Sequence, residues 1–373
     1  MRIAIVGSAY PFRGGLAAFN ERLAREFMSL GHEVRLYTFT VQYPTWLFPG
    51  KTQLRSGPPP ADLDIQRTLH SIEPLSWWRT GRQLQHWEPD LVIAKFWLPV
   101  MGLSLGSVLY LAPKTARRLA ILDNVIPHER RPGDKAFTRY FIRAVDGAVA
   151  MTAAVAEEWK RLTQKPLRLL FHPIYDHYGP AVSKQEACDA LGLNPAYRYL
   201  LFFGLIRAYK GLDLLLEAWL AQRLYRFTDV KILIAGELYE PYDKYRPLLE
   251  SPRAKETVLF HEGFVPDEQV KYYFCAADAV IQPYRSATQS GVTQIAYYFE
   301  KPMIVTRVGG LSEMVTDGET GFCCEPDSES LAEAIERLLE TPSERFVQGL
   351  RAGKAKYSWR TFAEQIVSFG KGI

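Results

Sequence analysis

Residues 198–220 read RYLLFFGLIRAYKGLDLLLEAWL, and this stretch decides the fold. Its first part, 199–205, is an unbroken apolar run, which is typical of a strand covered on both faces of a parallel sheet. Its last part, 212–220, has the apolar spacing of a buried helix. A strand that passes directly into a helix is the repeating unit of doubly wound α/β folds, so we expect that fold class here.

The same alternation of strand and helix patterns continues on both sides of this stretch. Further strands are predicted at 3–6, 34–39, 91–94, 119–122, 148–151, 230–235, 258–260, 279–282, 303–306 and 321–324. The alternation stops at 172–176, where HPIYD leads into a polar segment, and we place a hinge there. Since 373 residues suit about two domains of roughly 150 residues each, we predict two Rossmann-like domains, 1–175 and 176–356, that face each other across a cleft.

Composition and targeting signals exclude several classes of protein. The chain is 47% hydrophobic and 23% charged, which excludes disordered and coiled-coil architectures. The longest apolar stretch, 100–112, contains Gly and Ser and falls short of the roughly 18 residues that a membrane span needs. It predicts a buried helix, with an interfacial helix as the alternative. The strand-like N-terminus and four cysteines without metal-type spacing predict a cytoplasmic protein.

Positive charge is concentrated in one segment. The net charge is only +4, which gives no reason to expect nucleic acid. Between 113 and 143, however, eight Lys or Arg residues stand against three Asp or Glu residues. Clustered cations attract anionic lipid surfaces, so we expect peripheral contact with the inner face of the cell membrane. Solvated helix faces are the alternative.

Two turns between strands and helices carry the signals of a phosphate site. Arg207 and Lys210 lie between the strand and the helix of the opening stretch, where helix N–H groups and an Arg fork suit phosphate oxygens. The second turn, 283–293, reads PYRSATQSGVT; Gly291 admits a ligand to the backbone, and the Ser290 and Thr293 hydroxyls stand beside the helix start. Solvated cations and a polar capped turn are the respective alternatives.

A third turn, at Gly14 and Gly15, follows the first strand. The run 7–15 does not match G-x-G-x-x-G, so a nicotinamide-dependent enzyme is disfavoured. The glycine pair could let a sugar or phosphate approach the backbone from the other side of the cleft, or it could be a plain turn.

An ordered set of short motifs in the second half resembles glycosyltransferase family 4. The motifs are FG at 203–204 with KG at 210–211, GFVP at 263–266, SG at 290–291 with KP at 301–302, and GG at 309–310 with Glu313 and DG at 317–318. The first half resembles the family more loosely, through Gly14-Gly15 and GHEV at 31–34. The resemblance implies the glycosyltransferase B fold, with a nucleotide sugar on 176–356, an acceptor on 1–175 and a final helix, 357–373, that crosses back to the first domain.

The resemblance also assigns roles to individual residues. It implies that Arg207 and Lys210 neutralise the departing diphosphate. Donor diphosphate and sugar contacts fall on Gly14, Gly15, Ser290, Gly291, Val292 and Thr293, and nucleoside contacts on Gly236, Phe264 and Val265. The family often carries two glutamates separated by seven residues, but Ala287 and Ile295 stand at those positions. The chain therefore resembles a variant without those carboxylates.

One histidine and two possible metal motifs remain. His128 is our candidate for the family histidine that contacts the donor sugar, although Asp123 stands where that residue is expected; a structural hydrogen bond is the alternative role. His172 and His177 have no further ligand nearby, and Asp62-Leu63-Asp64 matches a metal-binding Asp-x-Asp by chance. We therefore expect no metal and no other cofactor.

The sequence as a whole predicts a retaining, metal-independent hexosyltransferase of polysaccharide biosynthesis. It would move a sugar from a nucleoside diphosphate donor to a hydroxyl of a glycan or lipid-linked acceptor. Two rivals stay open: a nucleotide-sugar-binding protein that has lost turnover, suggested by the missing carboxylates, and a nucleotide-sugar epimerase of similar fold.

Overall fold

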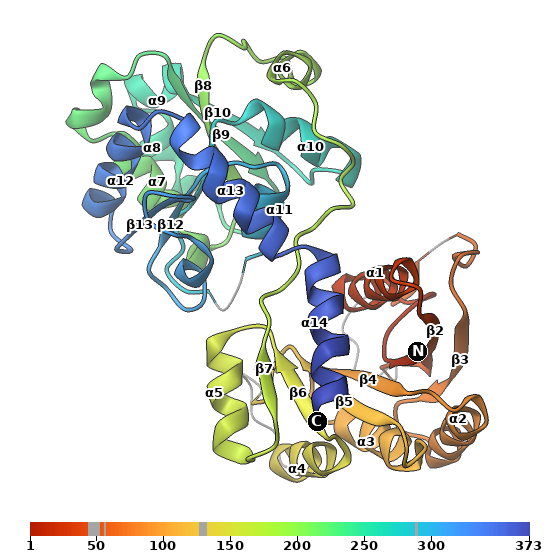
Figure 1. Ribbon diagram of the computed structural model, residues 1–373. Coiled ribbons are helices and arrows are strands. Elements are labelled where there is room, and N and C mark those ends of the chain that lie inside the picture. Colours follow the sequence, from red (N-terminus) through yellow and green to blue (C-terminus); the bar gives the residue numbers. More distant parts are fainter. Residues whose placement is uncertain (44–52, 56, 127–132, 288–289) are drawn as a thin grey trace. The chain divides into compact units, whose positions relative to one another are not determined.

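The computed structural model divides the chain into two compact units, drawn in Figure 1. It describes residues 1–43, 53–55, 57–126, 133–287 and 290–373. Unit 1 comprises Met1–His172 and Trp359–Ile373, and unit 2 comprises Pro173–Ser358. The predicted boundaries after 175 and 356 lie within three residues of these crossings.

Unit 1 is built on a seven-stranded parallel sheet in the order β3-β2-β1-β4-β5-β6-β7. Its strands are β1 Arg2–Val6, β2 Glu33–Val41, β3 Ile65–His70, β4 Leu91–Phe96, β5 Arg117–Leu122, β6 Gly147–Ala150 and β7 Leu167–Leu169. From β1 the chain builds outward to β3 and then returns to β4 on the other side. The strand order therefore reverses between β1 and β4, and such a reversal opens a crevice at the carboxyl ends of the two strands.

Helices cover both faces of this sheet, as Figure 1 shows. They are α1 Gly15–Ser29, α2 Pro74–Trp87, α3 Met101–Leu111, α4 Asp134–Ala144, α5 Ala153–Leu162 and α14 Trp359–Gly372. Along β1, Ile3 and Ile5 pack into one core with α1 and α14, while Ala4 and Val6 pack into the other core with α3. This double burial is the reason why the strands are apolar on both faces. The stretch 100–112 forms the buried helix α3, as predicted.

Unit 2 is built on a six-stranded parallel sheet in the order β10-β9-β8-β11-β12-β13. The strands are β8 Arg198–Phe203, β9 Val230–Gly236, β10 Val258–Glu262, β11 Ala279–Gln282, β12 Met303–Thr306 and β13 Gly321–Cys324. The helices are α6 Lys184–Leu191, α7 Leu212–Trp219, α8 Arg246–Leu249, α9 Pro252–Thr257, α10 Asp267–Ala276, α11 Gly291–Tyr298, α12 Ser328–Glu340 and α13 Glu344–Lys356. Here the order reverses between β8 and β11.

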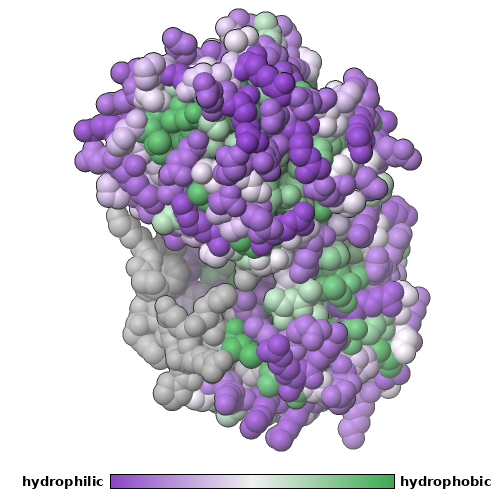
Figure 2. All heavy atoms as spheres, turned by 90° about the vertical axis from the view of Figure 1, so that its left-hand side faces the viewer, coloured by the Kyte–Doolittle hydropathy of each residue, from purple (hydrophilic) through white to green (hydrophobic). Residues whose placement is uncertain are grey.

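Both units are thus doubly wound α/β structures, and the predicted fold class is confirmed. The face of the molecule in Figure 2 is mostly hydrophilic, with hydrophobic residues in small groups between the polar ones. Across the described ranges, no helix combines the length and the apolar character that a membrane crossing requires.

Candidate active site

The two predicted phosphate turns of unit 2 lie side by side at the reversal of its strand order. Arg207 and Lys210 follow β8, and the turn at 283–290 follows β11, the neighbouring strand. The backbone N–H of Arg285 donates to the Tyr209 carbonyl oxygen at 2.7 Å and so joins the two turns directly. Gly211 (φ +66°) makes this approach possible, because a Cβ there would lie 2.0 Å from the Pro283 carbonyl oxygen.

Lys210 is a buried cation without an anionic partner among the residues that the structure describes. Lys210 is only 9% exposed to solvent. Its ammonium lies 5.4 Å from the centre of the Tyr284 ring. No carboxylate of the described residues lies within 4 Å of it. Burial first, and the charge of Arg207 second, lowers the pKa of Lys210 to about 8. A buried charge is costly unless it is paired, so this position favours an incoming anion.

Arg207 reinforces that preference. Its guanidinium lies over the Tyr239 ring, 4.8 Å from the ring centre, and it too forms no ion pair with any residue that the structure describes. The neighbouring Arg285 differs, because its Nη1 donates to Asp213 Oδ1 at 2.6 Å. Of these three cations, Arg285 is thus neutralised, whereas Arg207 and Lys210 have no ion-pair partner among the described residues.

The start of α11 provides backbone donors beside these cations. Ser290 caps the helix, its Oγ accepting from the Val292 N–H at 3.2 Å and lying 3.2 Å from the Tyr284 hydroxyl. The Thr293 hydroxyl, which the sequence analysis assigns to a ligand, instead donates to Gln282 Oε1 at 3.0 Å. The Thr293 hydroxyl is therefore occupied in this structure by a buried amide, and its contact with a ligand stays a prediction. The N–H groups of the first helical turn remain as donors.

Tyr284 is the residue of this site that sequence reasoning missed. Its ring contacts the Lys210 ammonium and its hydroxyl contacts Ser290, so one buried side chain links the two turns. Burial raises the pKa of its hydroxyl, which stays neutral. The sequence feature that could have indicated Tyr284 is its position: it is an aromatic residue two places after a buried strand and directly before Arg285.

Gly291 lies against an aromatic ring from the segment that enters unit 2. A Cβ at this position would lie 2.9 Å from Tyr175 Cε2. Packing against the Tyr175 ring is therefore one reason for a glycine at position 291, in addition to the predicted ligand contact. The two reasons can be separated, since Tyr175 can be truncated independently.

The predicted nucleoside contacts lie after β9 and β10. Phe264 is 72% exposed, and Val265 follows it in the same loop. Gly236, at the end of β9, has φ +154°, and a Cβ there would lie 1.9 Å from the Gly204 carbonyl oxygen. Its lack of a side chain is thus required by backbone packing beneath the turn that carries Arg207.

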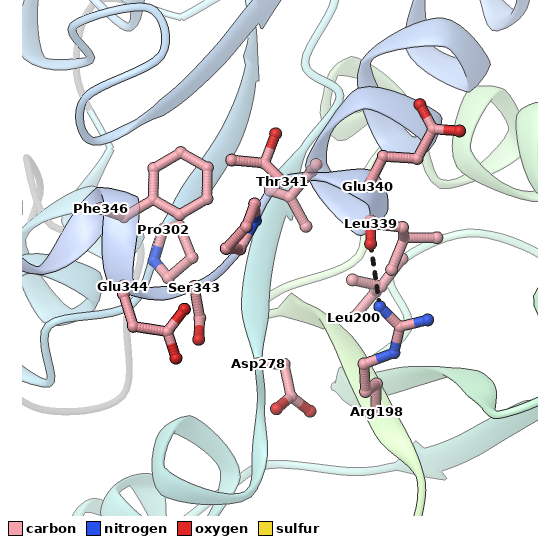
Figure 3. A pocket seen from close by; sticks show the side chains of 12 residues that line it. Arg198, Leu200, Asp278, Pro302, Leu339, Glu340, Thr341, Ser343, Glu344 and Phe346 are labelled. Carbon is pink, nitrogen blue, oxygen red and sulfur yellow. Dashed lines mark hydrogen bonds between the residues drawn. The ribbon is translucent and has the colours of Figure 1, made fainter.

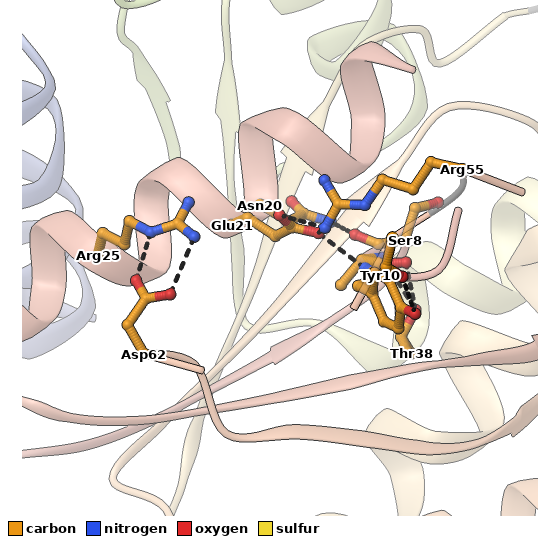
Figure 4. A network of polar contacts seen from close by, with 10 residues as sticks. Ser8, Tyr10, Asn20, Glu21, Arg25, Thr38, Arg55 and Asp62 are labelled. Carbon is orange, nitrogen blue, oxygen red and sulfur yellow. Dashed lines mark hydrogen bonds and ion pairs between the residues drawn. The ribbon is translucent and has the colours of Figure 1, made fainter. Parts of the chain in front are cut away.

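In unit 1, the predicted glycine turn leads into α1. Gly14 has φ +100°, and no atom lies within 4 Å of a Cβ built on Gly14 or Gly15, so a ligand could approach the backbone of both. Below the turn, buried Glu21 accepts from the Tyr10 N–H and from Arg55, as Figure 4 shows. This network fixes the loop after β1. Asp62 pairs with Arg25 in the same view rather than standing ready for a metal.

The ends of β4 and β5 hold a second buried cation. Lys95 Nζ lies 3.0 Å from Asp123 Oδ1 and 3.4 Å from the centre of the Phe19 ring. Burial lowers the pKa of Lys95, and the Asp123 carboxylate opposes that shift. Unlike Lys210, this lysine has an internal anion, so it needs no ligand to balance its charge. His128 lies outside the described residues.

A pocket of about 370 Å³ lies at the amino ends of strands in unit 2, opposite the carboxyl ends that hold the two turns (Figure 3). It is lined by Arg198, Asp278 and Pro302, which stand at or just before the amino ends of β8, β11 and β12. Arg198 is already bound to Asp229 and to the Leu339 carbonyl, and Asp278 to Lys184. Ligands of doubly wound sheets bind at the carboxyl ends, so this pocket is not the candidate active site.

Comparison with known proteins shows what this chain resembles. Residues 197–341, which include both phosphate turns, match the family described as "Glycosyl transferases group 1". These residues form a group 1 glycosyltransferase domain. A D-inositol 3-phosphate glycosyltransferase of Arthrobacter sp. is 27% identical, the match covering 96% of this chain and 90% of that protein. A lipopolysaccharide core mannosyltransferase of Rhizobium meliloti is 29% identical over about half of each chain.

Solved structures agree on the fold. A glycosyltransferase from Rickettsia africae superposes with a TM-score of 0.74 at 14% identity, the match covering 99% of this chain and 98% of that one. Anabaena HepE in complex with UDP gives 0.70 at 15% identity over the whole of both chains. These structures confirm the predicted glycosyltransferase B fold. The predicted glycosyltransferase activity is confirmed by the family match of 197–341 and by the relatives. The separate roles of the individual site residues stay predictions.

The pKa of Lys210 predicts how this glycosyltransferase responds to pH. A bound diphosphate favours the charged lysine and raises its pKa above the value of about 8 in the free protein. Binding above pH 8 must therefore take up a proton, and affinity for a nucleoside diphosphate should fall about tenfold between pH 7 and pH 9. Calorimetric titration across this range measures the slope. Lys210→Arg, which stays protonated, should remove it; an unchanged slope in that variant would contradict the assignment.

Gly291 allows a second prediction. Gly291→Ala should weaken nucleoside diphosphate binding at least tenfold, or about 1.4 kcal/mol, because the methyl group occupies space beside the helix amides. In the wild-type background it should also lower thermal stability, since the methyl group meets the Tyr175 ring. In a Tyr175→Ala background the stability loss should disappear and the binding loss should remain. If Tyr175→Ala restores binding as well, glycine serves the ring contact alone.

Proposed function

We propose that unit 2 binds a nucleoside diphosphate sugar at Arg207, Lys210 and the first turn of α11, and that the enzyme transfers the sugar with retention to an acceptor hydroxyl bound by unit 1. The observation that carries this proposal is the buried Lys210 ammonium, which has no carboxylate partner within the described chain and lies beside helix amides. HepE, a protein of the same fold, has been solved with UDP and with UDP-glucose.

The chemistry follows from where charge develops. The bond between the anomeric carbon and the diphosphate oxygen breaks, a bond from the acceptor oxygen to that carbon forms, and the acceptor hydroxyl loses its proton. Negative charge grows on the departing diphosphate, and preorganised cations and amides at that place lower the barrier. Lys210 and Arg207 supply the cations, and α11 supplies the amides. The loops that follow β8 and β11 hold all of them on a rigid sheet edge.

We infer that the chain lacks the two carboxylates common in the family, because Ala287 and Ile295 stand where the resemblance places them. Ile295 is 4% exposed and belongs to the core of unit 2, so this position serves packing. Sugar and ribose contacts must then come from other groups. We propose that Phe264, which is exposed after β10, and the half-buried Val265 beside it supply part of the nucleoside contact.

We propose a polyhydroxylated acceptor, which the names of the relatives support. One is named for D-inositol 3-phosphate, another for the lipopolysaccharide core, and a human relative, 29% identical over 43% of this chain, is named an α-1,3/1,6-mannosyltransferase. We propose a glycan or lipid-linked glycan acceptor, with membrane contact through 113–143. UDP-glucose and GDP-mannose are the first donors to assay, with sugar transfer and acceptor-independent epimerisation followed separately.

Truncation of the two cations tests the site. Arg207→Ala and Lys210→Ala should each raise the barrier to transfer by about 2 to 4 kcal/mol, because each removes charge stabilisation from the leaving group. Arg246→Ala is the matched control: Arg246 is an exposed cation of unit 2 whose pair with Asp243 adds little. Initial rates at saturating donor measure the effect. Near-wild-type rates in both site variants, with folding shown by circular dichroism, would overturn the assignment.

The proposal also predicts transfer without a divalent metal. Within the described ranges, no three His, Cys, Asp or Glu side chains are grouped to hold a metal ion, and Asp62 and Asp64 pair with Arg25 and Arg35. Transfer rates in excess EDTA should equal those in buffer alone. Loss of activity in EDTA that Mn²⁺ or Mg²⁺ restores would contradict this expectation.

A further inference from the structure

Helices α2, α3 and α4 form one continuous layer on the sheet of unit 1. Glycines let them approach closely: a Cβ at Gly81 of α2 would lie 2.3 Å from Leu111 Cβ of α3, and one at Gly102 of α3 would lie 2.7 Å from the Phe137 carbonyl oxygen of α4. Figure 1 shows the three helices side by side on the face of the sheet away from α1 and α14. Their outer sides therefore belong to a single surface.

This surface carries cations that have no ion-pair partner in the described part of the chain. They are Arg79 and Arg82 on α2, and Lys135, Arg139 and Arg143 on α4, which we call the basic face; Lys114 and Arg117 flank it. All are exposed, and no carboxylate in the described part of the chain lies within 4 Å of their charged groups. Helices α2 and α3 contain no acidic residue, and α4 contains only Asp134.

Several exposed arginines of unit 2, in contrast, form ion pairs. Arg223 and Arg226 bind glutamates of α12, Arg246 binds Asp243, and Arg351 binds Glu300. These four arginines are neutralised by carboxylates of the same unit, whereas Arg207 of the candidate active site is not. The unbalanced charge of the basic face is thus a local property rather than a feature of the whole chain, whose net charge is only +4.

Large apolar side chains stand exposed among these cations. Ile72, Leu75 and Trp78 are each about half exposed, at 50%, 52% and 52%, and follow one another at intervals of three residues into α2. Tyr110 of α3 is 45% exposed. The Arg82 guanidinium lies 5.6 Å from the centre of the Trp78 ring. A helix that combines exposed Trp and Leu with Arg and has no acid is typical of a segment that lies in the headgroup region of a bilayer.

We propose that the basic face is the docking surface for an anionic lipid bilayer, with Leu75 and Trp78 entering the headgroup region while Arg79, Arg82, Lys135, Arg139 and Arg143 contact lipid phosphates. The apolar anchors favour a bilayer over nucleic acid, which offers phosphates without an apolar layer. The segment 113–143 alone gives only part of this surface, because α2 lies outside it. Docking at a bilayer would bring a lipid-linked acceptor to unit 1. This role of the basic face rests on the proposed function.

Vesicle sedimentation with the full chain tests the proposal. In 0.1 M salt the protein should bind phosphatidylcholine vesicles that contain 30% phosphatidylglycerol and should not bind pure phosphatidylcholine vesicles. Each cation removed should lower the partition coefficient about fivefold, so Arg79→Gln with Arg82→Gln should lower it about 25-fold. The matched control, Arg246→Gln with Arg351→Gln, makes the same change in net charge on unit 2 and should have little effect.

Leu75→Ser with Trp78→Ser should weaken binding even at high salt.

Three results would overturn the inference. They are binding that does not depend on phosphatidylglycerol, equal losses in the two double-arginine variants, or tighter binding to a single-stranded oligonucleotide than to the anionic vesicles. Donor binding by calorimetry should be unchanged in the Arg79 and Arg82 variant. Failed vesicle binding with intact donor binding would reject the docking surface alone, whereas failed donor binding in the wild-type protein would reject the proposed function.

Discussion

Parallel pairing of all strands in the described sheets is the constraint on which the rest of this structure depends. Parallel neighbours need a crossover connection, and the helices of those crossovers cover both faces of each sheet. The strands must therefore be apolar on both sides, as Ile3, Ala4, Ile5 and Val6 illustrate in β1. With the faces filled, the loops at the carboxyl ends are the places where polar side chains can meet a ligand.

The two lysines buried at such ends show how charge balance separates structure from function. Lys95 has Asp123 at 3.0 Å, so its cost of burial is offset inside unit 1. Lys210 has an aromatic ring and a second cation as neighbours, and its lowered pKa reflects that imbalance. A diphosphate would supply the missing negative charge. The same side chain, at equivalent ends of two similar sheets, is thus structural in one unit and available for a ligand in the other.

Charge balance also distinguishes the surfaces of the two units. Arg223, Arg226 and Arg246 on unit 2 are paired with acidic residues, whereas the arginines on α2 and α4 have no such partners in the described structure. Unpaired surface cations cost little in water, because solvent and salt screen them. They gain importance only beside a polyanionic surface, where several act together. An enzyme that takes a lipid-linked acceptor has a use for such a surface.

The sequence by itself determined the fold class and, to within three residues, the points where the chain passes between its units; it also located the two turns that we propose to bind phosphate. These features are local: apolar runs mark buried strands such as β8 and β11, and turn residues follow them directly. It missed β3 and β7, because edge strands are half exposed and lack an apolar run, and α2, whose exposed Leu75 and Trp78 blur the helical pattern. Only the tertiary structure decided that Arg285 is neutralised and Lys210 is not, that Thr293 bonds inward and that Tyr175 lies on Gly291. These facts depend on pairing between segments far apart in the chain, and local sequence patterns carry no information about such distances.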